Sequence, residues 1–246
     1  MKGLLFREFY LGRKYYMMSL LMFLLVMTIS LLTNLSLICG NLSRLSEDSI
    51  FQVNENALTI MTILPCLVIF ISFCTDGGVT FSDYNTHWLK YCGTTPMSEK
   101  KIVTVKFTAK IISLVTAFIF SLIYTVILGA ITGDRFSFSA FKNLFIIFTF
   151  AVVFSSIFIM LSIDCKDKNA VTKRLVAIFA ALYVPTMIYV ITLMNNSAEE
   201  DIFQGVVMPA VDKIKNILFP LSPVIITVSV AVCYAMSIRF LKRREN

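Results

Sequence analysis

Six stretches of the chain contain no Asp, Glu, Lys, Arg or His and consist mainly of apolar residues. They cover residues 16–38, 57–73, 111–131, 144–163, 175–193 and 217–238. A helix needs about 20 apolar residues to cross roughly 30 Å of hydrocarbon, so five stretches are long enough and 57–73 lies at the short end of the range. The pattern predicts an all-α integral membrane protein with six transmembrane helices.

The composition agrees with this fold class. Hydrophobic residues make up 57% of the chain and charged residues only 15%, whereas about a quarter of the residues in a soluble domain are charged. The spans and their connections use nearly all of the 246 residues, which leaves no segment of the usual size for a separate soluble domain. We therefore expect one membrane domain, residues 16–246, preceded by a short segment, residues 1–15.

Lys and Arg residues are distributed unequally between the two ends of the predicted spans. Seventeen of the 22 lie on one side, and the other side holds Arg44, Arg135, Lys142, Lys213 and Lys215. Because positively charged loops remain in the cytoplasm, both termini are predicted to be cytoplasmic. The net charge of +7 then reflects topology and contact with lipid headgroups, and it does not indicate binding to nucleic acid.

Several segments have two interpretations. Lys2 to Lys14 mixes apolar and charged side chains, which predicts a helix along the inner membrane interface, with a disordered basic leader as the alternative. On the outer side, Ser197 to Asn216 is interrupted at Pro209 and is compatible with a short re-entrant piece. Pro65 and Pro185 occupy corresponding places in the two three-span halves, which fits an inverted repeat or two ordinary helix kinks.

The longest inner connection joins the second and third predicted spans. Here Asp83 is predicted to cap a short helix that contains His87, Trp88 and Tyr91, and Pro96 is predicted to begin the helix leading into the third span. Trp88 and Tyr91 are expected to be exposed. They fit either anchors at the lipid interface or a docking surface for a partner protein.

This connection resembles that of a known family. Its features are Asp76 after the second span, a short helix with an aromatic residue, Pro96-x-Ser98, and then Ile102-Val103-x-x-Lys106-Phe107. The order is similar to that in permease subunits of type 2 ABC transporters, particularly the small six-span permeases of Gram-positive bacteria. The amphipathic leader and the basic tail extend this resemblance over the full length.

The resemblance implies a bacterial plasma membrane protein that pairs with a second permease, either another copy or a paralogue. It also implies that each permease contacts a nucleotide-binding subunit through short coupling helices, here residues 82–91 and 164–174, and that residues 2–14 form a connector helix. The residues expected to couple to the ATPase are Asp83, His87, Trp88, Tyr91, Pro96, Asp164, Lys166, Asp167 and Lys168.

The absence of several motifs also favours a membrane subunit that is driven by a separate ATPase. There is no phosphate-binding loop of the G-x-x-x-x-G-K-[ST] type, so we expect ATP and Mg²⁺ to be bound by the partner subunit and no cofactor by this chain. The spans contain no Asp, Glu, Lys, Arg or His that could couple protons, which disfavours a proton-driven carrier. The single histidine, His87, has no partners at ligand or catalytic spacing, so no enzyme active site is expected.

Three hypotheses remain for function: the permease of an ATP-driven exporter, a channel or ion-independent carrier, and an accessory membrane protein. Small permeases of the resembled family are similar to exporters of antimicrobial or toxic peptides, including phenol-soluble modulins. We therefore expect an amphipathic peptide as cargo, with drugs or lipids as the alternative. Polar candidates for the translocation path are Thr33, Asn34, Ser113, Thr116, Tyr183 and Tyr189, although such groups also join helix to helix in membranes.

Overall fold

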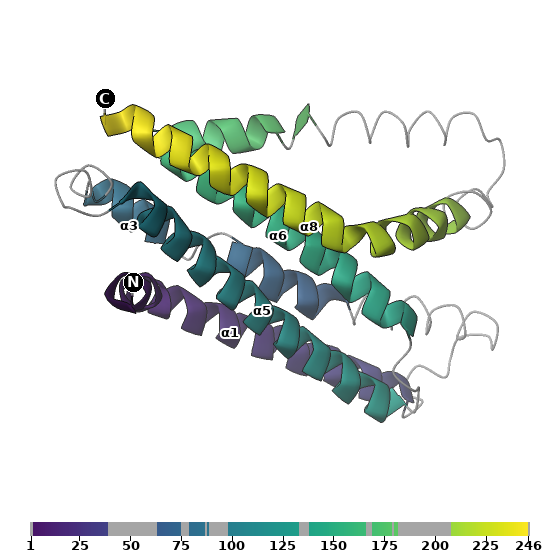
Figure 1. Cartoon of the computed structure of the whole chain (residues 1–246). Helices are drawn as coiled ribbons and strands as arrows, with labels where there is room; N and C mark the ends of the chain where they lie inside the picture. Colours follow the sequence, from purple (N-terminus) through teal and green to yellow (C-terminus); the bar gives the residue numbers. More distant parts are fainter. Residues whose placement is uncertain are drawn as a thin grey trace.

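The structure is a computed structural model in which all regular structure in the described part of the chain is helical. It describes residues 2–38, 63–74, 79–86, 88, 98–132, 138–165, 169–178, 180–181 and 208–245. The long helices lie roughly along one direction and form an elongated bundle (Figure 1). The predicted fold class, an all-α membrane protein, is confirmed at this level.

In the described part of the chain, four helices are long and apolar enough to cross a membrane. They are α1 (Lys2–Ile38), α5 (Glu99–Thr132), α6 (Phe138–Asp164) and α8 (Met208–Glu245). At about 1.5 Å per residue, even the 27-residue α6 is about 40 Å long, which exceeds the roughly 30 Å of a hydrocarbon core. These helices contain the first, third, fourth and sixth predicted spans.

The second and fifth predicted spans are described only in part. The second corresponds to a shorter apolar helix, Ile63–Cys74, and the fifth to helical residues 175–178 and 180–181. Pro65 lies in the first of these helices, whose preceding residues are outside the described part of the chain, and Pro185 also lies outside the described residues. A count of six spans and the comparison of two three-span halves therefore remain predictions.

The core lies where α1, the 63–74 helix, α5 and α6 meet. The 63–74 helix contributes Cys66, Ile69, Phe70 and Phe73 to this core, all of them buried. Phe118 of α5 stacks near Phe148 of α6, with ring centroids 4.9 Å apart. On the other side of the bundle, α8 packs along α6 (Figure 1).

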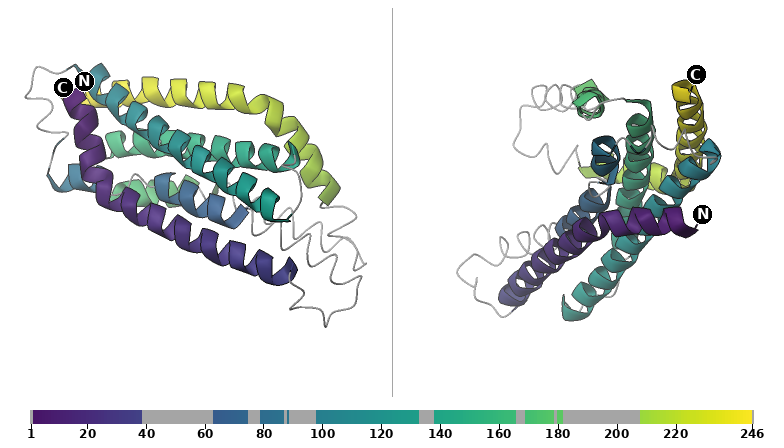
Figure 2. Two further views of the ribbon diagram at one scale, coloured as in Figure 1. Left: turned by 90° about the horizontal axis from the view of Figure 1, so that it is seen from below. Right: turned by 90° about the vertical axis from the view of Figure 1, so that its left-hand side faces the viewer.

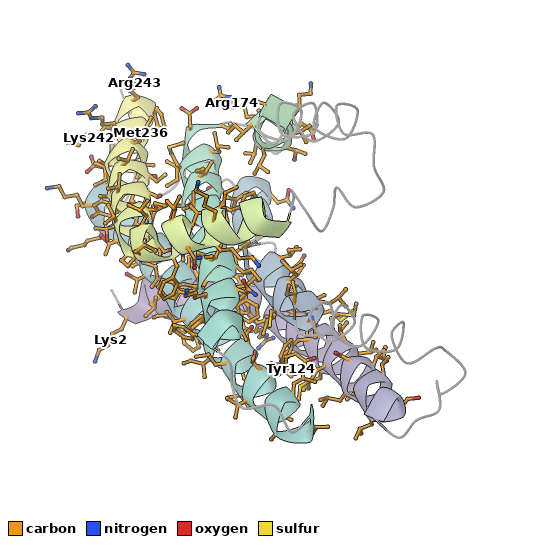
Figure 3. The ribbon with its side chains drawn as sticks, turned by 90° about the vertical axis from the view of Figure 1, so that its right-hand side faces the viewer. Lys2, Tyr124, Arg174, Met236, Lys242 and Arg243 are labelled. Atoms are coloured by element: carbon orange, nitrogen blue, oxygen red, sulfur yellow. The ribbon has the colours of Figure 1, made fainter. Side chains whose placement is uncertain are left out.

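Hydroxyl groups in the long helices mostly bond to the backbone of their own helix. Ser155 and Ser156, for example, donate to the carbonyls of Ala151 and Val152 one turn earlier. This arrangement satisfies a polar group where water is absent. A different case is the bond between the Ser30 and Tyr124 hydroxyls, 2.6 Å long and buried, which joins α1 to α5. Tyr124 lies among the helices (Figure 3).

The leader is helical and continues into the first predicted span within α1. A bend in α1 turns its N-terminal part across the direction of the remainder (Figure 2). The boundary at residue 15 and the interfacial position of the leader remain predictions. Gly12 lies in this N-terminal part, where a Cβ atom would come within 2.5 Å of the Tyr16 ring. The sequence contains no strong helix stop here, since one glycine weakens a helix by only about 1 kcal/mol.

The helix α8 begins before its predicted span. It starts at Met208, so Pro209 occupies its first turn, where proline is tolerated. Residues 208–216 are therefore the first turns of α8, and the remainder of the proposed re-entrant segment lies outside the described residues. Pro220 and Pro223 are inside the helix, which bends along its course (Figure 2), as prolines lead us to expect.

Candidate functional site

Four charged side chains from three helices meet near the N-terminal end of the chain. Arg7 and Glu8 come from α1, Asp83 from the short helix α3 (Val79–Asn85), and Lys106 from α5. Arg7 Nη2 lies 2.5 Å from Asp83 Oδ1, and Lys106 Nζ lies 2.5 Å from Asp83 Oδ2. Glu8 Oε1 is 3.2 Å from Arg7 Nη1 and 3.6 Å from Lys106 Nζ. These four residues are called the charge cluster below.

Little of the charge cluster is accessible to solvent. The side-chain exposure is 3% for Asp83, 7% for Lys106, 10% for Glu8 and 22% for Arg7. Two cations and two anions alternate, so the cluster as a whole is neutral. Removing charges from water is costly, and the attraction between them compensates only when each charge has a well-placed partner. Both oxygens of Asp83 accept from a cation, which meets this condition.

The local sequence explains how Lys106 reaches this site. Ile102, Val103, Lys106, Phe107 and Lys110 are all buried, and their spacing of three or four residues places them on one face of α5. Ser98 precedes α5, and its carbonyl accepts the first backbone bonds of the helix. The predicted helix start near Pro96 and Ser98 is therefore confirmed to within a few residues.

Trp88 connects the charge cluster to the apolar core. The Arg7 guanidinium lies over its ring, with Cζ 4.0 Å from the ring centroid, a favourable cation–π distance. The same ring packs against a cluster that includes Ile102, Val103 and Phe107 of α5. Trp88 is thus half-buried, and the prediction of an exposed Trp88 is wrong. The arrangement fixes the connection between the second and third predicted spans to both the leader and α5.

The predicted role of Asp83 as a helix cap is also wrong. The helix α3 begins at Val79 and ends at Asn85, so Asp83 lies within it and its carboxylate bonds to Arg7 and Lys106 instead. A local capping rule cannot foresee partners that lie 76 and 23 residues away in the chain. The remaining coupling candidates of this connection, His87, Tyr91 and Pro96, lie outside the described residues.

An ion pair spans the connection that follows α6. Asp164, the last residue of α6, accepts from Arg174. This hydrogen bond raises the pKa of the Arg174 guanidinium. Both side chains are partly exposed, at 27% and 55%, so the pair differs in burial from the charge cluster. Lys166, Asp167 and Lys168 lie outside the described residues.

The candidates for the translocation path do not converge on one place in the described part of the chain. The Thr33 and Thr116 hydroxyls bond to carbonyls of their own helices. Ser113 is buried, bonds to the Ala109 carbonyl and lies 3.3 Å from the Tyr16 hydroxyl. Asn34 is part of α1, while Tyr183 and Tyr189 lie outside the described residues.

Sequence reasoning missed Arg7, Glu8 and Lys106 as members of a site. The available signal was the presence of opposite charges among the apolar residues of the leader and on the apolar face that leads into the third span. No group of His, Cys, Asp and Glu able to hold a metal occurs among the described residues. In comparisons with known proteins, no family model, no curated protein and no solved structure matches the chain.

Proposed function

We propose that the chain is the transmembrane subunit of an ATP-driven ABC exporter, with six spans and both termini in the cytoplasm. The observation that supports this proposal best is the charge cluster, which joins the leader, the inner connection and α5. A subunit driven by an external ATPase needs a rigid link between its cytoplasmic surface and its spans. The charge cluster and Trp88 supply such a link.

The proposed coupling works through α5. When the ATPase displaces the connection that contains α3, the displacement is transmitted through Asp83 to Lys106 and Arg7. Lys106 belongs to a continuous helix of 34 residues, about 50 Å long, so a displacement at one end of α5 moves the part inside the membrane. Arg7 transmits the same displacement to α1.

In this proposal the partner subunit binds ATP and Mg²⁺, and a second permease, identical or paralogous, completes the pathway in a bacterial plasma membrane. The cargo is an amphipathic or antimicrobial peptide. The exposed apolar surfaces of α1, α5 and α8 are compatible with contacts to lipid, a second permease and an apolar cargo.

The function is tested with the chain and the ATPase that copurifies with it, reconstituted in liposomes. We expect transport of an amphipathic peptide, and peptide-stimulated hydrolysis, to require ATP. Transport that persists without nucleotide and collapses with an ionophore would support a carrier and refute the exporter.

The coupling residues are tested with Arg7→Lys, which keeps the charge but loses the planar fork that contacts both Glu8 and Asp83. We expect recovery of the ATPase to be unchanged and peptide-stimulated hydrolysis to fall several-fold. Arg13→Lys makes the same change at an exposed arginine of α1 outside the charge cluster, so it is the control and should retain stimulation. Equal peptide-stimulated hydrolysis in the two variants would refute a role of the charge cluster in coupling.

The orientation is tested by thiol labelling of intact cells with an impermeant reagent. The native Cys165 is a poor reporter because it is only 3% exposed, so the exposed Lys173 is replaced by cysteine instead. Lys173→Cys should not react from outside, whereas Ser197→Cys should react. The reverse pattern would invert the proposed topology.

A further inference from the structure

A basic cavity lies at the C-terminal end of α8, apart from the charge cluster. Its volume is about 370 Å³, and it is lined by Met236, Arg239, Phe240, Lys242 and Arg243. All of these residues belong to α8 and the cavity is open to the outside, so it is a groove on the helix surface rather than an enclosed pocket. Met236, Lys242 and Arg243 project from the end of α8 (Figure 3).

The charge of this cavity is uncompensated in the described part of the chain. Arg239, Lys242 and Arg243 are all exposed, and the ion pairs of the described residues involve other side chains. Three cations around one cavity favour a ligand with a phosphate or another compact anionic group, because guanidinium groups bind phosphate oxygens in pairs.

The apolar part of the ligand is indicated by a stripe that leads to the cavity. Val224, Val228, Val232 and Met236 are exposed and follow one another at intervals of four residues, which places them on one side of α8. From Val224 to Met236 the stripe is about 18 Å long, close to half of the roughly 30 Å hydrocarbon thickness, which is one leaflet.

We propose that this cavity and stripe form a binding site for one anionic phospholipid. The phosphate of the headgroup contacts Arg239, Lys242 and Arg243, and an acyl chain lies along the stripe from Met236 toward Val224. The site needs only that α8 crosses the membrane with its C-terminal end at the surface. It is independent of the proposed transport function, and lipid binding can be measured without transport.

The stripe distinguishes a lipid from a free phosphate. Inorganic phosphate could contact the cations, but it would leave Met236 and the valines exposed. A zwitterionic lipid could cover the stripe, but the cationic group beside its phosphate would offset the attraction to Arg239, Lys242 and Arg243. An anionic phospholipid satisfies both parts of the site at once.

The test counts the lipids bound to the purified full chain by native mass spectrometry, in titrations with phosphatidylglycerol and with phosphatidylcholine. We expect one saturable phosphatidylglycerol per chain. In Arg239→Gln/Arg243→Gln its affinity should fall about thirtyfold, because each basic residue near a membrane surface contributes roughly a fivefold attraction. Lys100→Gln/Lys101→Gln removes two exposed charges at the beginning of α5 and should leave the affinity unchanged.

Two further measurements identify the ligand. Met236→Gln, which shortens the apolar stripe without altering charge, should weaken phosphatidylglycerol binding several-fold, and millimolar inorganic phosphate should not displace the lipid. The proposal is overturned by equal affinity for the two lipids, by an equal loss in the Lys100 and Lys101 control, or by displacement with inorganic phosphate. Tighter binding of an acidic amphipathic peptide at the same site would also overturn it.

Discussion

The charge cluster makes a sharp prediction for Asp83→Asn, which removes one negative charge while keeping the shape of the side chain. In the native chain both Asp83 oxygens lie 2.5 Å from a cation. After the substitution, Glu8 is left as the anion facing both Arg7 and Lys106. One buried positive charge therefore loses its compensation.

The magnitude follows from burial. Breaking a buried ion pair by removing one partner typically costs about 3 to 5 kcal/mol, because the remaining charge stays desolvated. Asp83 is 3% exposed and Lys106 7%, so this range applies, but Arg7 at 22% can recover some hydration and favours the lower end. A loss of about 3 kcal/mol lowers the ratio of folded to unfolded protein more than about a hundredfold.

The assay is the free energy of unfolding in mixed micelles, followed by tryptophan fluorescence. The chain has one tryptophan, and this Trp88 lies directly under the Arg7 guanidinium, so the signal reports on the site. Asp164→Asn makes the same chemical change at an exposed ion pair and is the matched control. Its effect should be much smaller, since exposed pairs contribute little.

A double variant tests the electrostatic cause. Asp83→Asn together with Arg7→Gln restores neutrality, so it should be less destabilised than the sum of the two single variants. Equal losses for Asp83→Asn and Asp164→Asn, or strict additivity in the double variant, would refute the reasoning that burial and charge balance stabilise the cluster.

Two other predictions concern the helices. Gly12→Ala should lower the free energy of unfolding by about 1 kcal/mol, because the new Cβ would meet the Tyr16 ring at 2.5 Å and overpacking outweighs the gain in helix propensity; Gly3→Ala, with open space around it, should be neutral or stabilising in the same assay. Ser30→Ala and Tyr124→Phe should each lower the free energy of unfolding by about 0.6 to 1.7 kcal/mol, as the loss of an interhelical hydrogen bond in a membrane does. In a double-mutant cycle the two losses should be coupled, because both variants remove the same 2.6 Å bond. Additive losses would contradict that bond.

Charge-free apolar stretches predicted the long helices well, because their length is fixed by the thickness of the hydrocarbon. The stretches in α1, α5, α6 and α8 all lie within helices. The leader was predicted as a helix that precedes the first span, and the two form one bent helix that ends at Ile38 (Figure 2). Helix propensity continues through Gly12, so the sequence does not mark a break between them.

The site was the least predictable part, for a physical reason. Asp83 was identified as important, but for a local role at a helix terminus. Its actual partners come from α1 and α5 and are brought together only by tertiary packing. A charged residue on a buried helix face, such as Lys106 beside Val103 and Phe107, requires a counterion, and that requirement was the signal available in the sequence.

The positions of the polar links bear on how the bundle can move. The helices α1 and α5 are joined by three polar links, Glu8 with Lys106, Tyr16 with Ser113, and Ser30 with Tyr124, so they are expected to move together. Between α5 and α8, the Thr104 and Tyr234 hydroxyls are 2.9 Å apart, close in the chain to Lys106.

Further along α5, the contact with α6 is made by aromatic rings, among them Phe118 with Phe145 and Phe148. Ring contacts are less directional than hydrogen bonds between buried groups, which are costly to leave unsatisfied. A rearrangement between the α1 and α5 pair and the α6 and α8 pair is therefore expected to pivot near the charge cluster and to slide at the aromatic contact. In that geometry, a displacement imposed on α3 would be largest at the opposite end of α5.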